Sequence, residues 1–143
     1  MVAKKSVKSK GSAGLNKKNS EAFLTKFSQH PDSITTESGL MYKIIEQAEQ
    51  KTYPQLSDTV VINQRILLAD GSVIADSYKA GLPETFALNE AIEGLREGIL
   101  LMPIGARYEF VIPAELAWGK KGNRGKIGPN ALLHFDVRLI RVE

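Results

Sequence analysis

Residues 89–105 predict a helix inside a chain whose other apolar segments follow the alternation of strands. Ile92, Leu95 and Ile99 recur at i, i+3 and i+7, which places them on one stripe of an α-helix. Asn89 can cap the start, because its side-chain oxygen can accept a backbone N–H. A short helix with one apolar stripe must bury that stripe, so we expect it to pack on the neighbouring strands.

Alternating apolar and polar residues indicate strands on both sides of this helix. Asp70-Gly71 is a strong hairpin-turn signal, and most of the strands are expected to be connected as hairpins. The pattern therefore predicts an α+β fold with one crossing helix and an antiparallel sheet of five to six strands. The expected strands cover residues 39–46, 58–68, 72–77, 85–88, 106–112 and 131–142.

Basic residues gather at the N-terminus. Residues 1–18 carry six lysines and no acidic residue, whereas the other 125 residues carry 13 basic and 16 acidic side chains. Their low apolar content predicts a disordered basic tail. The tail can be a solubilising arm or a weak contact for a polyanionic partner, and the sequence leaves both interpretations open. The lysines of such a contact would be Lys4, Lys5, Lys8 and Lys10.

Residues 19–38 predict a short helix and a linker that precede the main domain at residues 39–143. The helix is expected to start at Asn19 or Ser20, with Phe23 and Phe27 one turn apart on the same face. A helix of this length is marginal by itself, so it must dock on the domain or fray.

The composition narrows the classes of function. The chain has no cysteine, which excludes disulfides, thiolate chemistry and cysteine-bound zinc and fits a reducing compartment. The sequence has no run of 18 apolar residues and no apolar segment of the kind that follows the basic start of a secretory signal. His30 and His134 lack partners at metal-ligand spacing. We therefore expect a cytoplasmic protein with no cofactor, no metal and no membrane partner.

Several short motifs carry a family resemblance. The motifs are Asp70-Gly71, Ala91-Ile92-Glu93-Gly94-Leu95, Leu101-Met102-Pro103-Ile104-Gly105, Val111-Ile112-Pro113, Leu116-Ala117-Trp118-Gly119, Ile127-Gly128-Pro129-Asn130 and Leu133-His134-Phe135-Asp136-Val137. In order and spacing they resemble the FKBP-type peptidyl-prolyl cis-trans isomerases. Residues 19–46 are similar to the bacterial Mip/FkpA branch of this family, in which a helix leads into the enzyme domain. The dimerising region of that branch is not apparent, which predicts a monomer.

The resemblance implies a sheet wrapped around one short helix and an enzyme that rotates the peptide bond before proline. The barrier to that rotation is ~18–20 kcal/mol, because amide resonance must be broken. An apolar pocket helps, because the planar amide is more polar than the twisted one. The expected substrates are proline-containing protein segments, and macrolide inhibitors are a further ligand class that the sequence leaves open.

The resemblance also implies a set of site residues. Catalytic roles fall on Trp118, Phe135, Ile92 and Asp76. Substrate binding falls on Phe86, Ala91, Leu95, Ile127, Gln64 and Ile74.

Several of these positions, and the neighbouring Ala75, depart from the family pattern. Trp118 replaces a tyrosine, Leu95 replaces a tryptophan, and Gln64 stands where an aromatic residue is expected. Ile74-Ala75 stands where the family has Phe-Asp, so Asp76 comes one residue late and would face away from the site unless a β-bulge corrects it.

These departures leave two hypotheses. The first is an isomerase of reduced activity that acts on X-Pro bonds in unfolded or flexible segments. The second is a non-catalytic protein-binding or chaperone module. In either case the basic residues of the glycine-rich loop at 119–130 predict a preference for acidic residues beside the proline.

Overall fold

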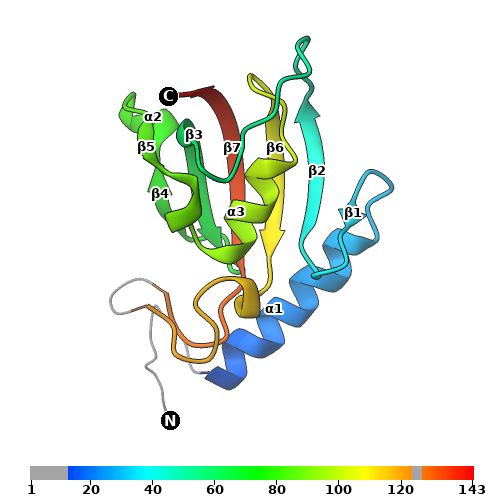
Figure 1. The fold of residues 1–143 in the computed structure, drawn as a ribbon. Coiled ribbons are helices and arrows are strands. Elements are labelled where there is room, and N and C mark those ends of the chain that lie inside the picture. Colours follow the sequence, from blue (N-terminus) through cyan, green and yellow to red (C-terminus); the bar gives the residue numbers. More distant parts are fainter. Residues whose placement is uncertain (1–12, 124–126) are drawn as a thin grey trace.

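A computed structural model describes residues 13–123 and 127–143, and an antiparallel sheet lies at its centre (Figure 1). The strand order is β1-β2-β6-β7-β3-β4, and β5 pairs with β3 beside β4. The antiparallel α+β prediction is confirmed, with more strands than expected because two linker residues, Ile34 and Thr35, pair with β2. The seven strands of the described part are β1 (Ile34–Thr35), β2 (Met41–Glu46), β3 (Thr59–Leu68), β4 (Val73–Asp76), β5 (Glu84–Ala87), β6 (Arg107–Ile112) and β7 (Leu133–Val142).

Helix α3 (Glu93–Leu100) crosses the inner face of this sheet, as its apolar stripe predicts (Figure 1). Its start differs from the prediction. Asn89 lies in a separate 3₁₀ turn, η2 (Leu88–Glu90), and Ile92 precedes the helix without a side-chain capping bond. Ala91 and Ile92 have extended ψ angles of 158° and 152°, and this break in the backbone separates the turn from the helix.

Two glycines let the backbone of α3 lie close to the side chains of β6. A Cβ atom on Gly94 would lie 2.4 Å from Cγ2 of Ile112, and one on Gly98 would lie 2.6 Å from Cε1 of Phe110. Both distances are shorter than the separation that two non-bonded carbon atoms adopt. The helix backbone therefore rests directly on the side chains of β6, and its position over the sheet is fixed.

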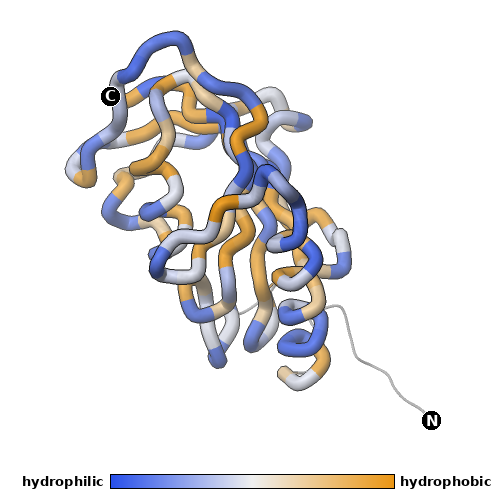
Figure 2. Tube along the Cα trace, turned by 90° about the vertical axis from the view of Figure 1, so that its right-hand side faces the viewer, coloured by the Kyte–Doolittle hydropathy of each residue, from blue (hydrophilic) through white to orange (hydrophobic). Residues whose placement is uncertain are grey.

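Helix α1 (Ala13–Ser28) packs on the outer face of the sheet, opposite α3. Phe27 is buried there with Val111 and Leu132. The helix begins before the expected Asn19, so residues 13–18 are helical rather than disordered, while the first twelve residues and their lysines lie outside the described part. Figure 2 shows hydrophilic residues over much of α1, and no helix in the described ranges is long and apolar enough to cross a membrane.

Side chains near the start of α1 hold the segment that leads into β7. Asn16 Nδ2 donates to the Pro129 carbonyl at 2.9 Å, and Ser20 Oγ donates to the Asn130 carbonyl at 3.1 Å. Ser20 Oγ also accepts from the Leu132 backbone N–H at 3.1 Å. These bonds explain why the helix extends beyond its apolar residues: its polar first turns are fixed by partners from the other end of the chain.

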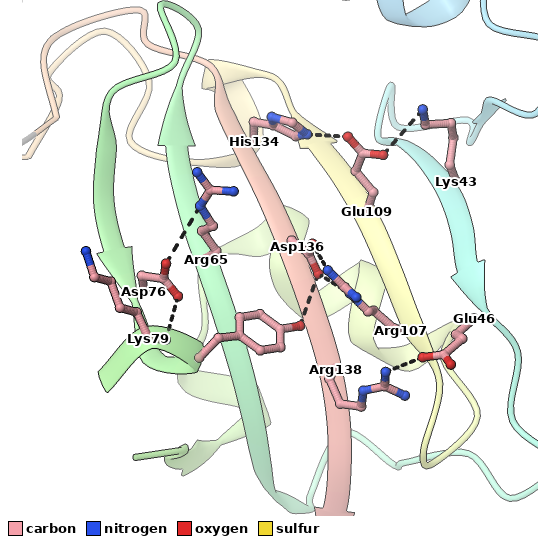
Figure 3. A network of polar contacts seen from close by, with 11 residues as sticks. Lys43, Glu46, Arg65, Asp76, Lys79, Arg107, Glu109, His134, Asp136 and Arg138 are labelled. Atoms are coloured by element: carbon pink, nitrogen blue, oxygen red, sulfur yellow. Dashed lines mark hydrogen bonds and ion pairs between the residues drawn. The ribbon is translucent and has the colours of Figure 1, made fainter. Parts of the chain in front are cut away.

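The outer face carries a chain of charged side chains across the strands (Figure 3). Arg107 binds Asp136 with two hydrogen bonds, of 2.8 and 2.6 Å, and the Tyr78 hydroxyl donates a third, of 3.0 Å. Burial alone would raise the pKa of Asp136, but these donors outweigh it and hold that pKa below its usual range. Burial, followed by the charge of Asp136, raises the pKa of Tyr78.

A second carboxylate on this face lies next to α1. Glu109 contacts the His134 ring and forms an ion pair with Lys43 at 3.4 Å, and the hydrogen bond from His134 holds the pKa of Glu109 below its usual range (Figure 3). The His134 ring lies 5.2 Å from that of Phe23, centre to centre. His134 therefore connects the charged side chains of the outer face with helix α1.

The lowered pKa of Asp136 predicts a pH-dependent stability. A carboxyl group whose pKa is lower in the folded state stabilises the fold above its unfolded pKa of about 3.9, and loses this contribution as the pH falls through the folded value. Asp136→Asn should therefore lower the free energy of unfolding by about 1–3 kcal/mol at neutral pH and by less at pH 3, which lies below the unfolded pKa. Urea unfolding at both pH values measures this, with Glu49→Gln, which removes an exposed carboxylate, as the control. An equal cost at both pH values would contradict the assignment.

Candidate active site

The inner face brings most of the predicted apolar site residues into one cluster. Leu95, Ile127 and Phe135 are buried in it. Ile74, Phe86, Ala91 and Ile92 are partly exposed and pack against it. The members come from β4, β5, the segment before α3, α3 itself, the glycine-rich loop and β7, and together they form one apolar cluster.

The sheet register fixes two aromatic side chains of this surface. Phe135 lies on β7 between Ile66 of β3 and Phe110 of β6. Phe86 lies on β5 opposite Val60, at the edge of the sheet. Residues directly opposite each other in an antiparallel pair share a face, so both rings are directed toward the side of α3.

Trp118 lies at the border of the cluster and is 41% exposed. Leu116, the last residue of the short turn η3 (Ala114–Leu116), and the following Ala117 pack against the core, whereas Trp118 is not part of it. Its carbonyl accepts a 3.1 Å hydrogen bond from Gly122, and Gly122 has a φ of 70° that favours glycine. This turn sets the path of the loop, of which Arg124 and Lys126 lie outside the described residues while Lys120 and Lys121 are exposed.

Asp76 does not join the site. A β-bulge between the pairs Ile66–Ala75 and Leu67–Val73 accommodates Ile74, so Ala75 faces inward and Asp76 pairs with Arg65 on the outer face. The Asp76 carboxylate lies 3.7 Å from Arg65 Nε and caps α2 (Ser77–Ala80) by accepting the Lys79 backbone N–H at 3.1 Å (Figure 3). A bulge is present, but it does not bring Asp76 to the site, so the catalytic role expected for this carboxylate is not supported by its position on the face opposite the apolar cluster.

Gln64 lies on the inner face and is only 6% exposed. Its backbone N–H donates to Ser77 Oγ at 2.8 Å, and its side-chain Nε2 donates to Glu84 Oε1 at 3.1 Å. Its Oε1 is buried and has no hydrogen-bond partner within the described ranges. Glu84 lies just before the strand expected at residues 85–88 and was not predicted as a site residue. The only available signal was its position two residues before Phe86.

These features agree with the result of comparing the chain with protein families. A family model described as FKBP-type peptidyl-prolyl cis-trans isomerase matches residues 50–140. The chain belongs to this family. A second model, described as a domain amino terminal to FKBP-type peptidyl-prolyl isomerase, matches residues 1–44. The family and the FKBP fold expected from the sequence motifs are thus confirmed.

Bacterial FKBP proteins of the Mip and FkpA type are among the relatives. Peptidyl-prolyl cis-trans isomerase Mip from Coxiella burnetii is 42% identical over 128 residues, which cover 90% of this chain and 55% of the relative. Outer membrane protein MIP from Legionella longbeachae is 39% identical over 143 residues, covering 100% of this chain and 61% of the relative. The chain spans about half to three fifths of these proteins.

Two solved structures show the same fold. The crystal structure of FkpA from Escherichia coli superposes with a TM-score of 0.87 at 37% identity, over 92% of this chain and 61% of that one. A peptidyl-prolyl cis-trans isomerase from Pseudomonas syringae superposes with a TM-score of 0.82 at 24% identity, over 93% of this chain and 97% of that one.

Proposed function

We propose that this FKBP chain catalyses the cis–trans isomerisation of X-Pro bonds in unfolded or flexible protein segments. The observation that supports this most is the inner-face cluster, in which partly exposed Phe86 and Ile92 lie against buried Leu95 and Phe135. A proline ring placed on this surface loses water around its amide. Because the planar amide is the more polar state, losing water raises its energy relative to the twisted transition state.

The reaction requires no nucleophile, metal or general base, because only a rotation about the C–N bond takes place. Rigid apolar walls are sufficient for part of the effect, since they hold the proline while the flanking residue rotates. Phe135 serves as a wall fixed in the middle of the sheet. Ile92 serves as the wall at the start of α3.

The test of this function is kcat/KM for a short X-Pro-Phe peptide in a protease-coupled isomerisation assay. Turnover above the uncatalysed rate is the expected result. The Leu95→Trp variant, which restores the aromatic residue usual in the family, should be measured beside it. If neither protein accelerates the reaction, the isomerase proposal is wrong.

The alternative is a binding or chaperone module that retains the fold without catalysis. Leu95 and Gln64 favour it, because each provides a smaller or less aromatic wall than the family pattern, and Ala75 favours it because it lacks the carboxylate of the family's aspartate. Suppressed aggregation of an unfolding client, together with no isomerase turnover, would support it.

Monomeric state and cytoplasmic location stay predictions as well: sedimentation velocity of the 15.7 kDa chain tests the first, and cell fractionation tests the second.

Trp118→Ala should lower kcat/KM about tenfold, because an aromatic wall contributes roughly 1–3 kcal/mol to binding a proline segment. The free energy of unfolding should change by less than about 0.5 kcal/mol, because the side chain is 41% exposed and lies outside the core. The peptide assay and urea unfolding measure the two effects. Tyr53→Ala, which removes another exposed aromatic residue, is the control and should leave turnover unchanged. Unaltered turnover in Trp118→Ala would place this residue outside the site.

A further inference from the structure

We propose that Glu84 provides the carboxylate of this site and makes it select proline segments that carry a cationic residue beside the proline. This inference rests on the proposed function and adds a substrate class to it. The family resemblance assigned an acidic residue to β4, but Asp76 faces outward. The geometry points instead to an acidic side chain on β5.

The register of β5 places Glu84 on the face of the apolar cluster. Glu84 pairs with Ile62 of β3, and Phe86 pairs with Val60. Ile62 and Val60 are fully buried members of the inner core. Since opposite residues of an antiparallel pair share a face, Glu84 and Phe86 are both directed to the inner side, one strand repeat apart. The carboxylate therefore lies beside an aromatic residue of the candidate site.

Gln64 holds this carboxylate in place and acts as a positioning residue. It is two residues from Ile62 on β3, so it shares the inner face, and its Nε2 donates to Glu84 Oε1 at 3.1 Å. A carboxylate can only accept, so the amide must turn its NH₂ group toward Glu84 and its own oxygen away. That oxygen is buried without a partner in the described part of the chain. A buried acceptor without a partner is unfavourable for stability, and the turn of the amide group toward Glu84 explains why it is present here.

The Glu84 carboxylate still has acceptor positions for a ligand. It is partly exposed, and among the described residues it forms no ion pair. The carboxylates of the outer face differ, because Asp76, Glu109 and Asp136 are each paired with a basic side chain. A negative charge that is oriented by a neutral amide and lacks a cation attracts a lysine or arginine of the substrate.

The test compares peptides with Lys, Ala or Glu placed directly before or directly after the proline. NMR exchange spectroscopy measures kcat/KM for isomerisation of each peptide at low ionic strength. At one of the two positions the wild-type protein should prefer Lys over Glu by about fivefold, the effect of a partly screened charge pair. Glu84→Gln should bring this ratio close to one, and Glu84→Lys should invert it. Glu49→Gln, an exposed carboxylate on the loop at 47–58, should leave the ratio as in the wild type.

The positioning role of Gln64 has its own variant. Gln64→Met keeps the length of the side chain and removes the donor, and it should lower the Lys-to-Glu ratio through KM. An equal loss with all peptides would show a packing role only and would overturn the positioning claim. The exposed Lys120 and Lys121 predict the opposite preference, so the Lys120→Gln/Lys121→Gln variant separates their effect from that of Glu84.

The outcomes distinguish this inference from the proposed function. A Lys-to-Glu ratio that is the same in wild type and Glu84→Gln overturns the role of Glu84 while turnover of the Ala peptides still supports isomerase activity. Absence of turnover with every peptide overturns the isomerase. In that case fluorescence of Trp118, the sole tryptophan, reports binding of the same peptides, and loss of the Lys preference in Glu84→Gln still supports Glu84 as the selecting group.

Discussion

Replacing Phe110 with alanine should lower the free energy of unfolding by about 3–5 kcal/mol, the usual range for a large core residue. Phe110 is fully buried in β6, and its ring centre lies 6.2 Å from that of Tyr42 and 6.1 Å from that of Tyr108. Gly98 presents its backbone to the same ring. The surroundings cannot fill the space, because a helix backbone on one side and two packed rings on the other have little freedom to move. Urea unfolding of the two proteins measures the difference.

Ile45→Ala is the matched control for this measurement. Ile45 also belongs to a strand of the sheet, but it is 46% exposed, so its loss should change the free energy of unfolding by less than about 0.5 kcal/mol. A cost below about 1 kcal/mol for Phe110→Ala would mean that α3 collapses into the cavity, and the tight contact at Gly98 would then not determine the position of the helix.

Gly94→Ala should reduce both stability and turnover. The added Cβ would lie 2.4 Å from Ile112 Cγ2 and 3.2 Å from the Leu116 carbonyl oxygen, so α3 must move away from β6. Overpacking of this kind costs about 1–3 kcal/mol. Ile92 and Leu95 flank this position, so the displacement should also lower kcat/KM about tenfold under conditions where the variant is folded. Urea unfolding and the peptide assay measure the two effects.

Gly14→Ala provides the comparison, because in the described part of the chain no atom beyond the neighbouring residues and the helix's own backbone lies within 4 Å of the added Cβ in α1. This change should be neutral or stabilise the protein by up to about 1 kcal/mol, since alanine is a better helix former than glycine. Full activity in Gly94→Ala, at unchanged stability, would show that the apolar surface tolerates a shift of the helix.

The parts of the fold that the sequence predicts well are those determined by local patterns. The stripe of Ile92, Leu95 and Ile99 places α3, and clean alternation places β6 and β7. The start of α1 could not be predicted in this way. Its first turns are held by Pro129, Asn130 and Leu132, which lie 110 to 113 residues further along the chain.

The apolar half of the candidate site could be predicted, because most of its residues belong to the short motifs through which the sequence resembles the family. The polar half could not. The orientation of Asp76 depends on a β-bulge at Ile74. The local sequence does not show which residue of a strand stays unpaired in such a bulge. From the sequence alone, Glu84 looks like a solvent-exposed residue before a strand. Only the strand register and the hydrogen bond from Gln64 show that it lies on the inner face.

The contacts between α1 and the segment before β7 also set the order in which the molecule can be completed. The hydrogen bonds join residues separated by 110 to 117 positions, so α1 emerges from the ribosome long before its partners are made. At roughly 5–20 residues per second this delay lasts on the order of 5–20 s, during which an isolated helix of this length is marginal. Helix α1 can therefore dock fully only after the segment before β7 has been made, and the cover of Phe27 is incomplete until Leu132 has been added.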